Sequence, residues 1–531
     1  MPVISQRRLP SRRCFAPSSG YTYSGAGSRS SSTWTKPSWP RRRPNELSAR
    51  QAASVRTVLL ISYTFPPQYD VSARRAAKLC KYLPGAGWRP IVLTKDWTHN
   101  VAPEDRSVFT LTEHAEAVAA LNGVTIVRAP YRTRDNALRR LHHRLGGTYE
   151  SGASAAGHRD GDVPQVPNGI TNHAERRLRR WTPLALTRRA LSLFSPTFGD
   201  FPDAFRGWVE PAVRSALELI ARERVDAICS LCPPATAHVV ASEVARRSGL
   251  PWVAQFDDLY SFHLERQRRA AWRPYADHRH REWMRYATLA GAITPAMLAY
   301  VQRTYGVDGQ VLVVGYDPDE SPTIRREAHD RLRLAYTGSI YPGDQRPDLL
   351  FAALEQVIRE RGGTTPPLEL IFAGTGRDAE LQASVAAFPA AARACRFVGR
   401  VPPAEALRMQ RDADALILLN CTNPSPGEGT LSYPAKAFEY LNAGRPILAL
   451  PRDPGAWGDR LLETTRAGTT AESADAAARV LASWLDEWER TDGISYAGDR
   501  TEIERYSQPR QAAVLGALLD RAVDIHTART P

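Results

Sequence analysis

The sequence predicts an α/β protein built from two doubly wound parallel sheets in tandem. Short apolar runs, typical of strands that are buried on both faces, alternate with helical patterns of about 10 to 15 residues. The alternation stops at a polar segment, SPTIRREAHD (321–330), and then starts again. At 531 residues, the chain is also too long for a single hydrophobic core. We therefore expect a first domain over residues 57–320 and a second over residues 321–500.

The first domain begins with a predicted strand in VLLISYTFPP (58–67), which runs into a loop stiffened by proline. A helix follows in SARRAAKLCKYLPGAGW and ends near Pro84 and Gly85, since neither residue readily continues a helix. Residues 131–195 have no clear period, and we interpret them as an insertion. The remaining predicted strands of this domain are PIVLT, GVTIVRAP, DAICSL, PWVAQF, GAIT and QVLVVGYD.

The second domain repeats the same alternation. Its predicted strands, each separated from the next by a helical pattern, are RLAYTGS, LELIFAG, CRFVG, ALILLN and PILAL. The last segment, 501–531, contains the helical pattern IERYSQPRQAAVLGALLDRAV. This terminal helix could stay on the second domain or cross back to the first.

The net charge of +14 is concentrated at the N-terminus. Residues 1–56 contain eleven Lys or Arg residues and one acid, Glu46, and so carry most of the excess. Their Ser, Pro and Arg-rich composition cannot bury a core, which predicts a disordered head or a start codon assigned too far upstream. The alternative is a basic arm that touches anionic lipid or nucleic acid. For the folded remainder we expect no nucleic-acid partner.

Targeting signals are also missing from the sequence pattern. No apolar run approaches the roughly 18 to 20 residues of a transmembrane helix, and no apolar stretch follows the N-terminal charges as it does in a secretory signal. Six scattered cysteines fit a reducing compartment. We expect a cytoplasmic protein and a structural role for the pair in CSLC (229–232).

The stretch SYPAKAFEYLNAGRPILAL (432–450) contains the most informative helix. Pro434 suits the first helical position and Gly444 the position after the last turn. Buried-looking strands on both sides predict a β-α-β unit, and ligands bind beyond the carboxyl ends of such strands. Free amides near Ala435 and Lys436, together with the helix dipole, predict an anion site there. Ser432 would add a hydroxyl and Lys436 a charge.

Glu439 lies one helical turn further on, where it is suited to accept hydrogen bonds from two vicinal hydroxyls. A phosphate and a diol held about one turn apart describe a ribose diphosphate. The alternative is an exposed Lys436–Glu439 pair, which contributes only about 0.2–0.5 kcal/mol. Glycine turns after two strands, at Gly338 in GSIYPGDQR and at Gly374 in AGTGRD, support the nucleotide interpretation, because glycine lets a backbone approach a ligand closely.

Together, these motifs resemble those of GT-B glycosyltransferases, in particular the retaining glycosyltransferase family 4. The resemblance spans roughly residues 57–450. It rests on LLISYTFPP, SARRAAKLCKYLPGAGW, FPDAFRGWVEPAV, SLCPPATAHVVA, PWVAQFDDLY, YTGSIYPG, IFAGTG, FVGRVP and PAKAFEYLNAGRPIL.

The resemblance implies roles for several residues of the second domain. Glu439 matches the second glutamate of the family's paired-glutamate motif, which holds the ribose of the sugar nucleotide. Gly338 and Ser339 match the turn beside the diphosphate. Arg400 and Val401 follow FVG, where the main chain meets the base. In the first domain, the loop 66–72 and the cations Arg74 and Arg75 would face the donor phosphates or the acceptor.

The chain departs from the family pattern in both predicted domains. The first glutamate of the pair is Leu431 here, although Glu428 stands nearby. The lysine that often follows the first turn of the second domain is absent, and Gln345 or Arg346 occupies that region. The family's DFRDLW pattern appears as QFDDLY (255–260), in which an acid and an arginine are replaced and Asp258 is kept.

The resemblance implies transfer of a hexose-type sugar from a nucleoside diphosphate sugar to an acceptor hydroxyl, with retention. We expect a glycan or lipid-linked acceptor in cell-envelope or exopolysaccharide synthesis. The donor is the only nucleotide required, and no metal is expected. Lys436, Arg346 and the amides around Ser339 and Ala435 would offset the charge of the departing diphosphate. Asp258 would orient or deprotonate the acceptor, or else cap a helix.

Two other functions stay open. One is a nucleotide-sugar-binding relative without catalysis, suggested by Leu431 and QFDDLY. The other is a sugar-nucleotide epimerase or hydrolase of the same fold. Separately, the basic and apolar segment RRLRRWTPLALTRRALSLF (176–194) could lie on a membrane surface, or be a helix that docks on the first domain.

Overall fold

The structure is a computed structural model of the whole chain. It describes residues 55–66, 68, 71–96, 121, 123–131, 201–203, 205–259, 273–320, 322, 329–341, 345–421, 433–452 and 456–529. The predicted head (1–56, apart from its last two residues), almost all of the predicted insertion (131–195) and the segment 176–194 lie outside the described residues, as do Glu428, Leu431 and Ser432.

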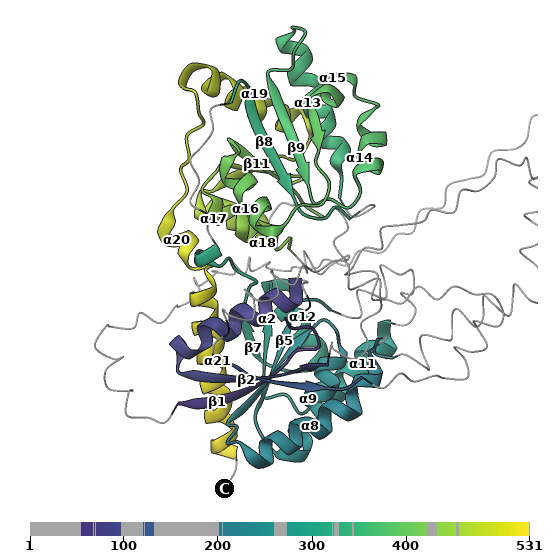
Figure 1. Cartoon of the computed structure of the whole chain (residues 1–531), viewed down its shortest axis with the longest axis vertical. Helices are drawn as coiled ribbons and strands as arrows, with labels where there is room; N and C mark the ends of the chain where they lie inside the picture. The colour runs from purple at the N-terminus through teal and green to yellow at the C-terminus, as the bar shows by residue number, and fades with distance from the viewer. Residues whose placement is uncertain are drawn as a thin grey trace, which may run out of the picture. The chain divides into compact units, whose positions relative to one another are not determined.

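Two parallel sheets organise the described chain, as the sequence predicts (Figure 1). The first has seven strands in the order β3-β2-β1-β4-β5-β6-β7. These strands are β1 (Arg56–Ile61), β2 (Trp88–Lys95), β3 (Thr125–Ala129), β4 (Ala227–Cys232), β5 (Trp252–Phe256), β6 (Leu289–Ala292) and β7 (Gly309–Val311). Its helical segments are α2 (Val71–Tyr82), η1 (Leu83–Ala86), η3 (Arg206–Trp208), α8 (Val209–Arg222), α9 (Thr236–Ser248), α11 (Arg273–Met284) and α12 (Pro295–Tyr305).

The second sheet has six strands in the order β10-β9-β8-β11-β12-β13. They are β8 (Leu332–Thr337), β9 (Leu368–Ala373), β10 (Cys395–Phe397), β11 (Ala415–Leu419), β12 (Ile447–Leu450) and β13 (Gly468–Thr470). The helical segments that follow the first sheet are η5 (Pro318–Glu320), α13 (Pro347–Arg361), α14 (Asp378–Val385), α15 (Pro389–Ala394), α16 (Pro403–Asp412), α17 (Lys436–Ala443), α18 (Trp457–Thr465), α19 (Ala474–Thr491), α20 (Arg500–Glu504) and α21 (Gln508–Arg529).

The central strands are buried along nearly their whole length, which explains their continuous apolar sequences. Every residue of β11 and of β12 is buried, and so are the last five residues of β1. A parallel sheet with helices on its faces excludes water from both sides, so an alternating polar pattern is not needed. Each sheet has its own core of Leu, Ile, Val and aromatic side chains.

The strand order reverses once in each sheet, between β1 and β4 and between β8 and β11. Ligands of open α/β sheets bind at such a switch point, beyond the carboxyl ends of the strands. In the second sheet, this point is followed by Gly338 and Ser339 on one side and by Asn420 on the other. The predicted glycine turn therefore lies at the position where the topology favours a ligand.

The terminal helix α21 crosses back and packs on the first domain, where it contacts α2, η1 and the strands β4 to β6. Figure 1 shows it alongside the first sheet, with the C-terminus at that domain. The crossing is fixed at the segment after β7, because Gln511 Oε1 accepts a hydrogen bond from Val313 N (3.1 Å) and Gln508 Nε2 donates to Val314 O. The last helix thus ties the end of the chain to its first domain.

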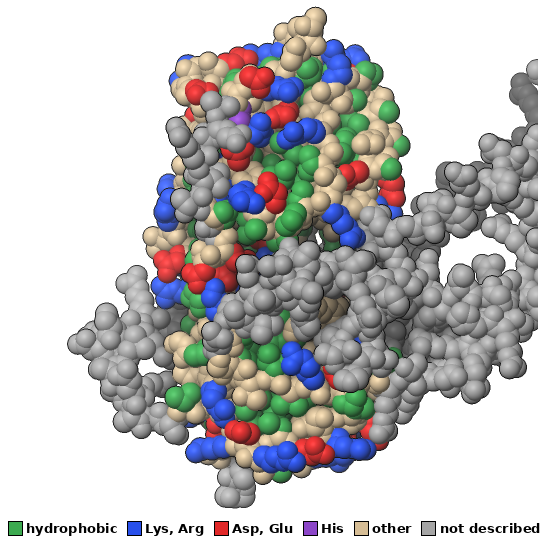
Figure 2. Space-filling view, viewed as in Figure 1, with side chains coloured by type: hydrophobic (Ala, Val, Ile, Leu, Met, Phe, Trp, Pro, Cys, Tyr) green, Lys and Arg blue, Asp and Glu red, His purple; other side chains and the backbone are tan. Residues whose placement is uncertain are grey.

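The described surface carries charges of both signs. Figure 2 shows lysine and arginine side chains interspersed with aspartate and glutamate on the visible face, without a continuous basic area over the coloured atoms. None of the helices in the described ranges combines the length and the apolar composition that crossing a bilayer requires.

Candidate functional site

Three turns meet at the carboxyl edge of the second sheet, and glycine makes each of them possible. Gly338, Gly374 and Gly399 follow β8, β9 and β10 with φ of +90°, +72° and +71°, which only glycine adopts readily. Gly338 N donates to Ala373 O (2.8 Å), and Gly374 N donates to Gly399 O (2.6 Å). Each turn therefore fixes the backbone of the next, and the edge is a preformed surface.

Asp378, the first residue of α14, also holds these turns together. Its Oδ2 accepts from Gly399 N (2.9 Å), while Oδ1 accepts from the hydroxyl of Thr375. The predicted base-contacting residues follow directly: Arg400 is exposed and Val401 is half-buried. Asp378 was not predicted from the sequence, although an acid in the first turn of a helix is a recognisable signal.

The helix α17 begins at Lys436, two residues later than Pro434, the predicted first helical position. Pro434 and Ala435 instead form an introductory turn, in which Ala437 N donates to Pro434 O (3.0 Å). Gly444 ends the helix in the left-handed conformation, as predicted. Phe438 N also donates to Ala435 O (3.2 Å), so an anion at this end would meet the amides of Ala435 and Lys436 and the positive end of the helix dipole.

Lys436 reaches from α17 back to the turn after β8. Its Nζ lies 2.9 Å from Ser339 O, 2.5 Å from Tyr336 Oη and 3.9 Å from the centroid of the Tyr336 ring. The side chain runs so close to Gly338 that a Cβ there would lie 3.3 Å from Lys436 Cε. Burial lowers the pKa of Lys436 to about 7, while the nearby Glu439 raises it. The ammonium thus links the helix end to the glycine turn.

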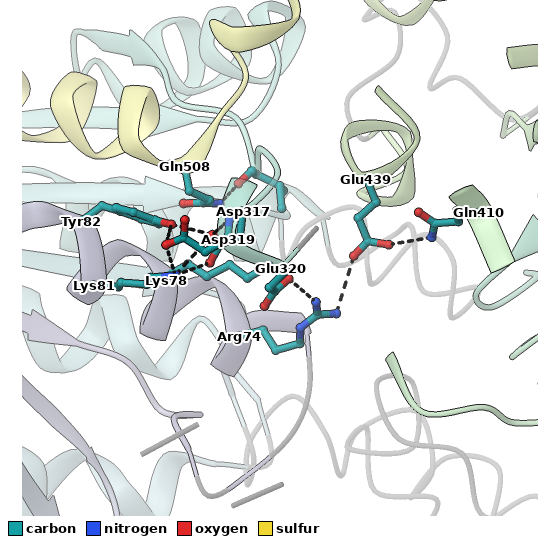
Figure 3. A network of polar contacts seen from close by, with 11 residues as sticks. Arg74, Lys78, Lys81, Tyr82, Asp317, Asp319, Glu320, Gln410, Glu439 and Gln508 are labelled. Atoms are coloured by element: carbon teal, nitrogen blue, oxygen red, sulfur yellow. Dashed lines mark hydrogen bonds and ion pairs between the residues drawn. The ribbon is translucent and has the colours of Figure 1, made fainter. Parts of the chain in front are cut away.

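Glu439 lies one turn further along α17, with about a quarter of its side chain exposed. Its Oε2 accepts a hydrogen bond from Gln410 Nε2 of α16 (3.3 Å), and its Oε1 lies 3.6 Å from Arg74 Nη1 of α2 (Figure 3). The carboxylate is therefore accessible to a ligand, while Gln410 donates a hydrogen bond to one of its oxygens and Arg74 lies near the other.

Arg74, near the start of α2, belongs to a charged group. Figure 3 shows it between Glu439 and Glu320, and its Nη2 donates to Glu320 Oε2 (3.0 Å). Lys78 donates to the same carboxylate oxygen (2.6 Å). Opposite charges hold the pKa of Glu320 below its usual value, even though burial alone would raise it. The predicted phosphate-facing cation is thus shared between two carboxylates here.

Arg75 has a different position from the one expected, and its predicted role at the donor phosphates or the acceptor is wrong. Its side chain is buried, with Nε 3.1 Å from Asp257 Oδ2 and Nη2 donating to Leu312 O. Gln255 Nε2 donates to Asp257 Oδ1 (2.8 Å). The altered QFDDLY motif therefore contains an ion pair whose cation comes from α2.

Asp258 follows this pair and is half-buried. Its Oδ1 accepts from Leu259 N (2.8 Å), and its carbonyl lies 3.8 Å from Cys232 Sγ. The residues that would form a capped helix after it lie outside the described ones. Cys229 and Cys232 of CSLC are both buried free thiols, and burial raises the pKa of each. This agrees with the structural role predicted for them.

Arg346 stands at the N-terminus of α13, beyond β8. Its guanidinium is exposed and pairs with Asp348, two residues on, with Nε 2.9 Å from Oδ1. The neighbouring Gln345 is buried and donates to Leu419 O (2.7 Å), which joins the segment after β8 to the end of β11. In the residues that the structure describes, no three His, Cys, Asp or Glu side chains group as metal ligands do.

Comparisons with known proteins give a family match in the second domain and a shared fold over most of the chain. Residues 331–486 match a family model described as Glycosyl transferases group 1. Among solved structures, Anabaena Alr3699/HepE in complex with UDP and glucose has a TM-score of 0.52 at 13% identity, over 88% of this chain and 100% of that one. A search of curated proteins gave no match.

Two further solved structures are less similar. A glycosyltransferase from Rickettsia africae ESF-5 has a TM-score of 0.48 at 10% identity, over 90% of this chain and 99% of that one. The lipopolysaccharide outer core galactosyltransferase WaaB has a TM-score of 0.48 at 12% identity, over 88% and 99%. The predicted resemblance to group 1 glycosyltransferases and the predicted GT-B fold are confirmed by the family match and the shared architecture.

Proposed function

We propose that the chain is a glycosyltransferase that moves a sugar from a nucleoside diphosphate sugar to an acceptor hydroxyl. One observation carries the proposal: Lys436 of α17 lies 2.9 Å from the carbonyl of Ser339, so the helix end and the glycine turn form one surface at the switch point of the second sheet. Glu439 stands one turn away on the same helix. The spacing suits a diphosphate and its attached ribose.

The donor would bind along this edge. Its diphosphate would meet the amides of Ala435 and Lys436 and the turn at Gly338, and the ribose hydroxyls would donate to Glu439. Arg400 and Val401 would lie beside the base. Gly374 has no side chain, so the protein backbone at this turn could approach the nucleotide closely. HepE, whose structure was determined with UDP and glucose, shares the fold and supports a uridine nucleotide as the first donor to try.

The chemical difficulty is the negative charge that grows on the departing diphosphate. Lys436 reaches the turn after β8 from α17, and Arg346 would add a second cation from the N-terminus of α13. Charge that is already in place beside the diphosphate lowers the barrier because it needs no rearrangement during the reaction. A diphosphate also favours the charged form of Lys436, whose pKa lies at about 7 in the free protein. We infer a reaction that needs no metal and proceeds with retention, as in glycosyltransferase family 4.

The acceptor side belongs to the first domain in this proposal. Asp258 would orient the acceptor hydroxyl or take its proton, and Arg74 would contact the donor phosphates once the ribose occupies Glu439. The altered QFDDLY motif supplies Asp257 as the anion for the buried Arg75. Turnover of a donor distinguishes a catalyst from a non-catalytic relative.

We place the reaction in the cytoplasm, with a glycan or lipid-linked acceptor of the cell envelope or of an exopolysaccharide. Segment 176–194 would give a peripheral membrane contact. Flotation with anionic liposomes tests that contact, since the full chain should float and a variant without 131–195 should not.

Binding and turnover together test the proposed function. A thermal-shift panel of UDP, GDP, ADP and dTDP should identify one base, and the matching radiolabelled sugar donors should yield labelled glycan. Glu439→Gln should weaken nucleotide binding, whereas Glu360→Gln, an exposed glutamate of α13, should not. Binding without turnover would support the non-catalytic relative. Release of isomerised sugar would support the epimerase. Failure of every nucleotide to bind would contradict the proposal.

A further inference from the structure

Glu439 is supported by a polar chain that the proposed function does not yet use. Gln410 of α16 is almost fully buried, and its Nε2 donates both to Glu439 Oε2 (3.3 Å) and to Thr337 Oγ1 (2.9 Å). Thr337, the last residue of β8, donates through its backbone N to Tyr440 Oη (2.9 Å), and its hydroxyl lies 3.5 Å from the same oxygen. Tyr440 follows Glu439 in α17, so the chain returns to the helix where it began.

This closed chain fixes the orientation of the Gln410 amide. Both of its N–H groups are used, one by a carboxylate and one by a hydroxyl. Exchanging the amide oxygen and nitrogen would set two acceptors, the carboxamide oxygen and the Glu439 carboxylate, against each other. Gln410 is therefore held as a donor toward Glu439, and the carboxylate is turned to meet it.

Stability alone does not explain a glutamine at this position. In the described part of the chain, Gln410 Oε1 is buried and has no hydrogen-bond partner. A buried polar atom without a partner is destabilising, and an apolar side chain of similar length would avoid that penalty. The hydrogen bond from Gln410 Nε2 explains the amide at this position, because it holds the partly exposed Glu439 carboxylate in one place.

We propose that Gln410 is a positioning residue that sets the Glu439 carboxylate for the ribose and thereby makes the site select ribose over 2′-deoxyribose. The inference rests on the proposed function, because it assigns Glu439 to the ribose hydroxyls. A glutamate side chain loses considerable rotamer freedom when it binds a ligand, and a carboxylate that is already oriented avoids part of that loss. Without Gln410, Glu439 would still carry its charge but not the geometry that accepts from two neighbouring hydroxyls.

The test compares ribonucleotides with their 2′-deoxy counterparts by isothermal titration of the intact chain, using UDP, GDP and ADP with dUDP, dGDP and dADP. A hydrogen bond to a charged group contributes about 1.5–3 kcal/mol, so the wild type should bind the preferred ribonucleotide roughly tenfold to a hundredfold more tightly than the deoxynucleotide. In Gln410→Met the ratio should fall to about one to threefold, while the affinity for inorganic pyrophosphate stays unchanged. If Gln410 only stabilised the fold, Gln410→Met would not change the ribose preference while leaving the affinity for pyrophosphate unchanged.

The matched control is Gln356→Met, because Gln356 also donates to a glutamate, Glu360 (2.9 Å), but on the exposed side of α13. Its ratio should equal that of the wild type. If Gln410→Met does not fold, Thr337→Val decides, because it removes the hydroxyl that anchors the amide and keeps the branched shape. It should also lower the ratio.

The outcomes separate the two proposals. A wild-type preference that persists in the folded Gln410→Met and Thr337→Val variants would overturn the role of Gln410 and leave the proposed function standing. A wild type that binds nucleoside diphosphates without any ribose preference would overturn the role of Glu439 itself, and with it this inference.

Discussion

The contact between Gly338 and Lys436 gives the sharpest single-residue prediction. Gly338 has φ of +90°, and a Cβ there would lie 3.3 Å from Lys436 Cε and 3.4 Å from its Nζ. In Gly338→Ala the left-handed backbone costs about 1–2 kcal/mol. The lysine must also move by a few tenths of an ångström, away from its bonds to Ser339 O and Tyr336 Oη. We expect lower stability and weaker nucleotide binding together.

The control isolates the second effect. Gly363 has φ of +87° and is exposed, and the nearest atom to an added Cβ would be Thr365 O at 3.9 Å. Gly363→Ala should therefore show a similar loss of stability in urea unfolding but no change in affinity. If the diphosphate is held by this turn, Gly338→Ala should lose a charge-assisted contact of about 1.5–3 kcal/mol, or roughly tenfold or more in Kd. Equal affinities of the two variants in isothermal titration would show that the diphosphate is not held by the turn at Gly338.

Two further predictions concern charge. Burial lowers the pKa of Lys436 to about 7, so at pH 8 the neutral form of this side chain outnumbers the charged form by about ten to one. The affinity for nucleoside diphosphates should therefore fall as the pH rises from 6 to 8.5. Lys436→Arg should flatten this pH profile, and an equal slope in both proteins would exclude Lys436 as its cause. Asp257→Ala should destabilise the fold by about 3–5 kcal/mol, since it leaves the buried Arg75 without its anion. Asp348→Ala removes only an exposed partner and should leave the urea midpoint nearly unchanged; similar midpoint shifts in the two variants would contradict the difference in burial.

The fold could be predicted from the sequence because its determinants are local. Strands buried on both faces are continuous apolar runs, and their alternation with helices identifies two parallel sheets before any contact is known. The end of α17 was predictable for the same reason, since Gly444 marks it in the sequence itself. The start was not, because Pro434 permits either a first helical turn or the introductory turn that is observed.

The site could be predicted only in part, because several of its contacts join distant residues. Lys436 and Glu439 were found through helix spacing, but the same pattern cannot show that Lys436 bonds to Ser339, 97 positions away. Arg75 follows Arg74 in the sequence, and nothing local distinguishes the buried cation from the half-buried one. Their difference comes from Asp257, which faces α2 only in the folded chain. Gln410 is likewise unremarkable within PAEALRMQRD until β8 and α17 surround it.

The most direct test of the proposed donor site is a crystal structure of the chain with its preferred nucleoside diphosphate. We predict that both ribose hydroxyls lie within about 2.6–3.2 Å of the Glu439 carboxylate. The diphosphate should lie against the turn at Gly338 and the amides of Ala435 and Lys436. A nucleotide bound elsewhere, or a Glu439 that points away from the ribose, would contradict the account.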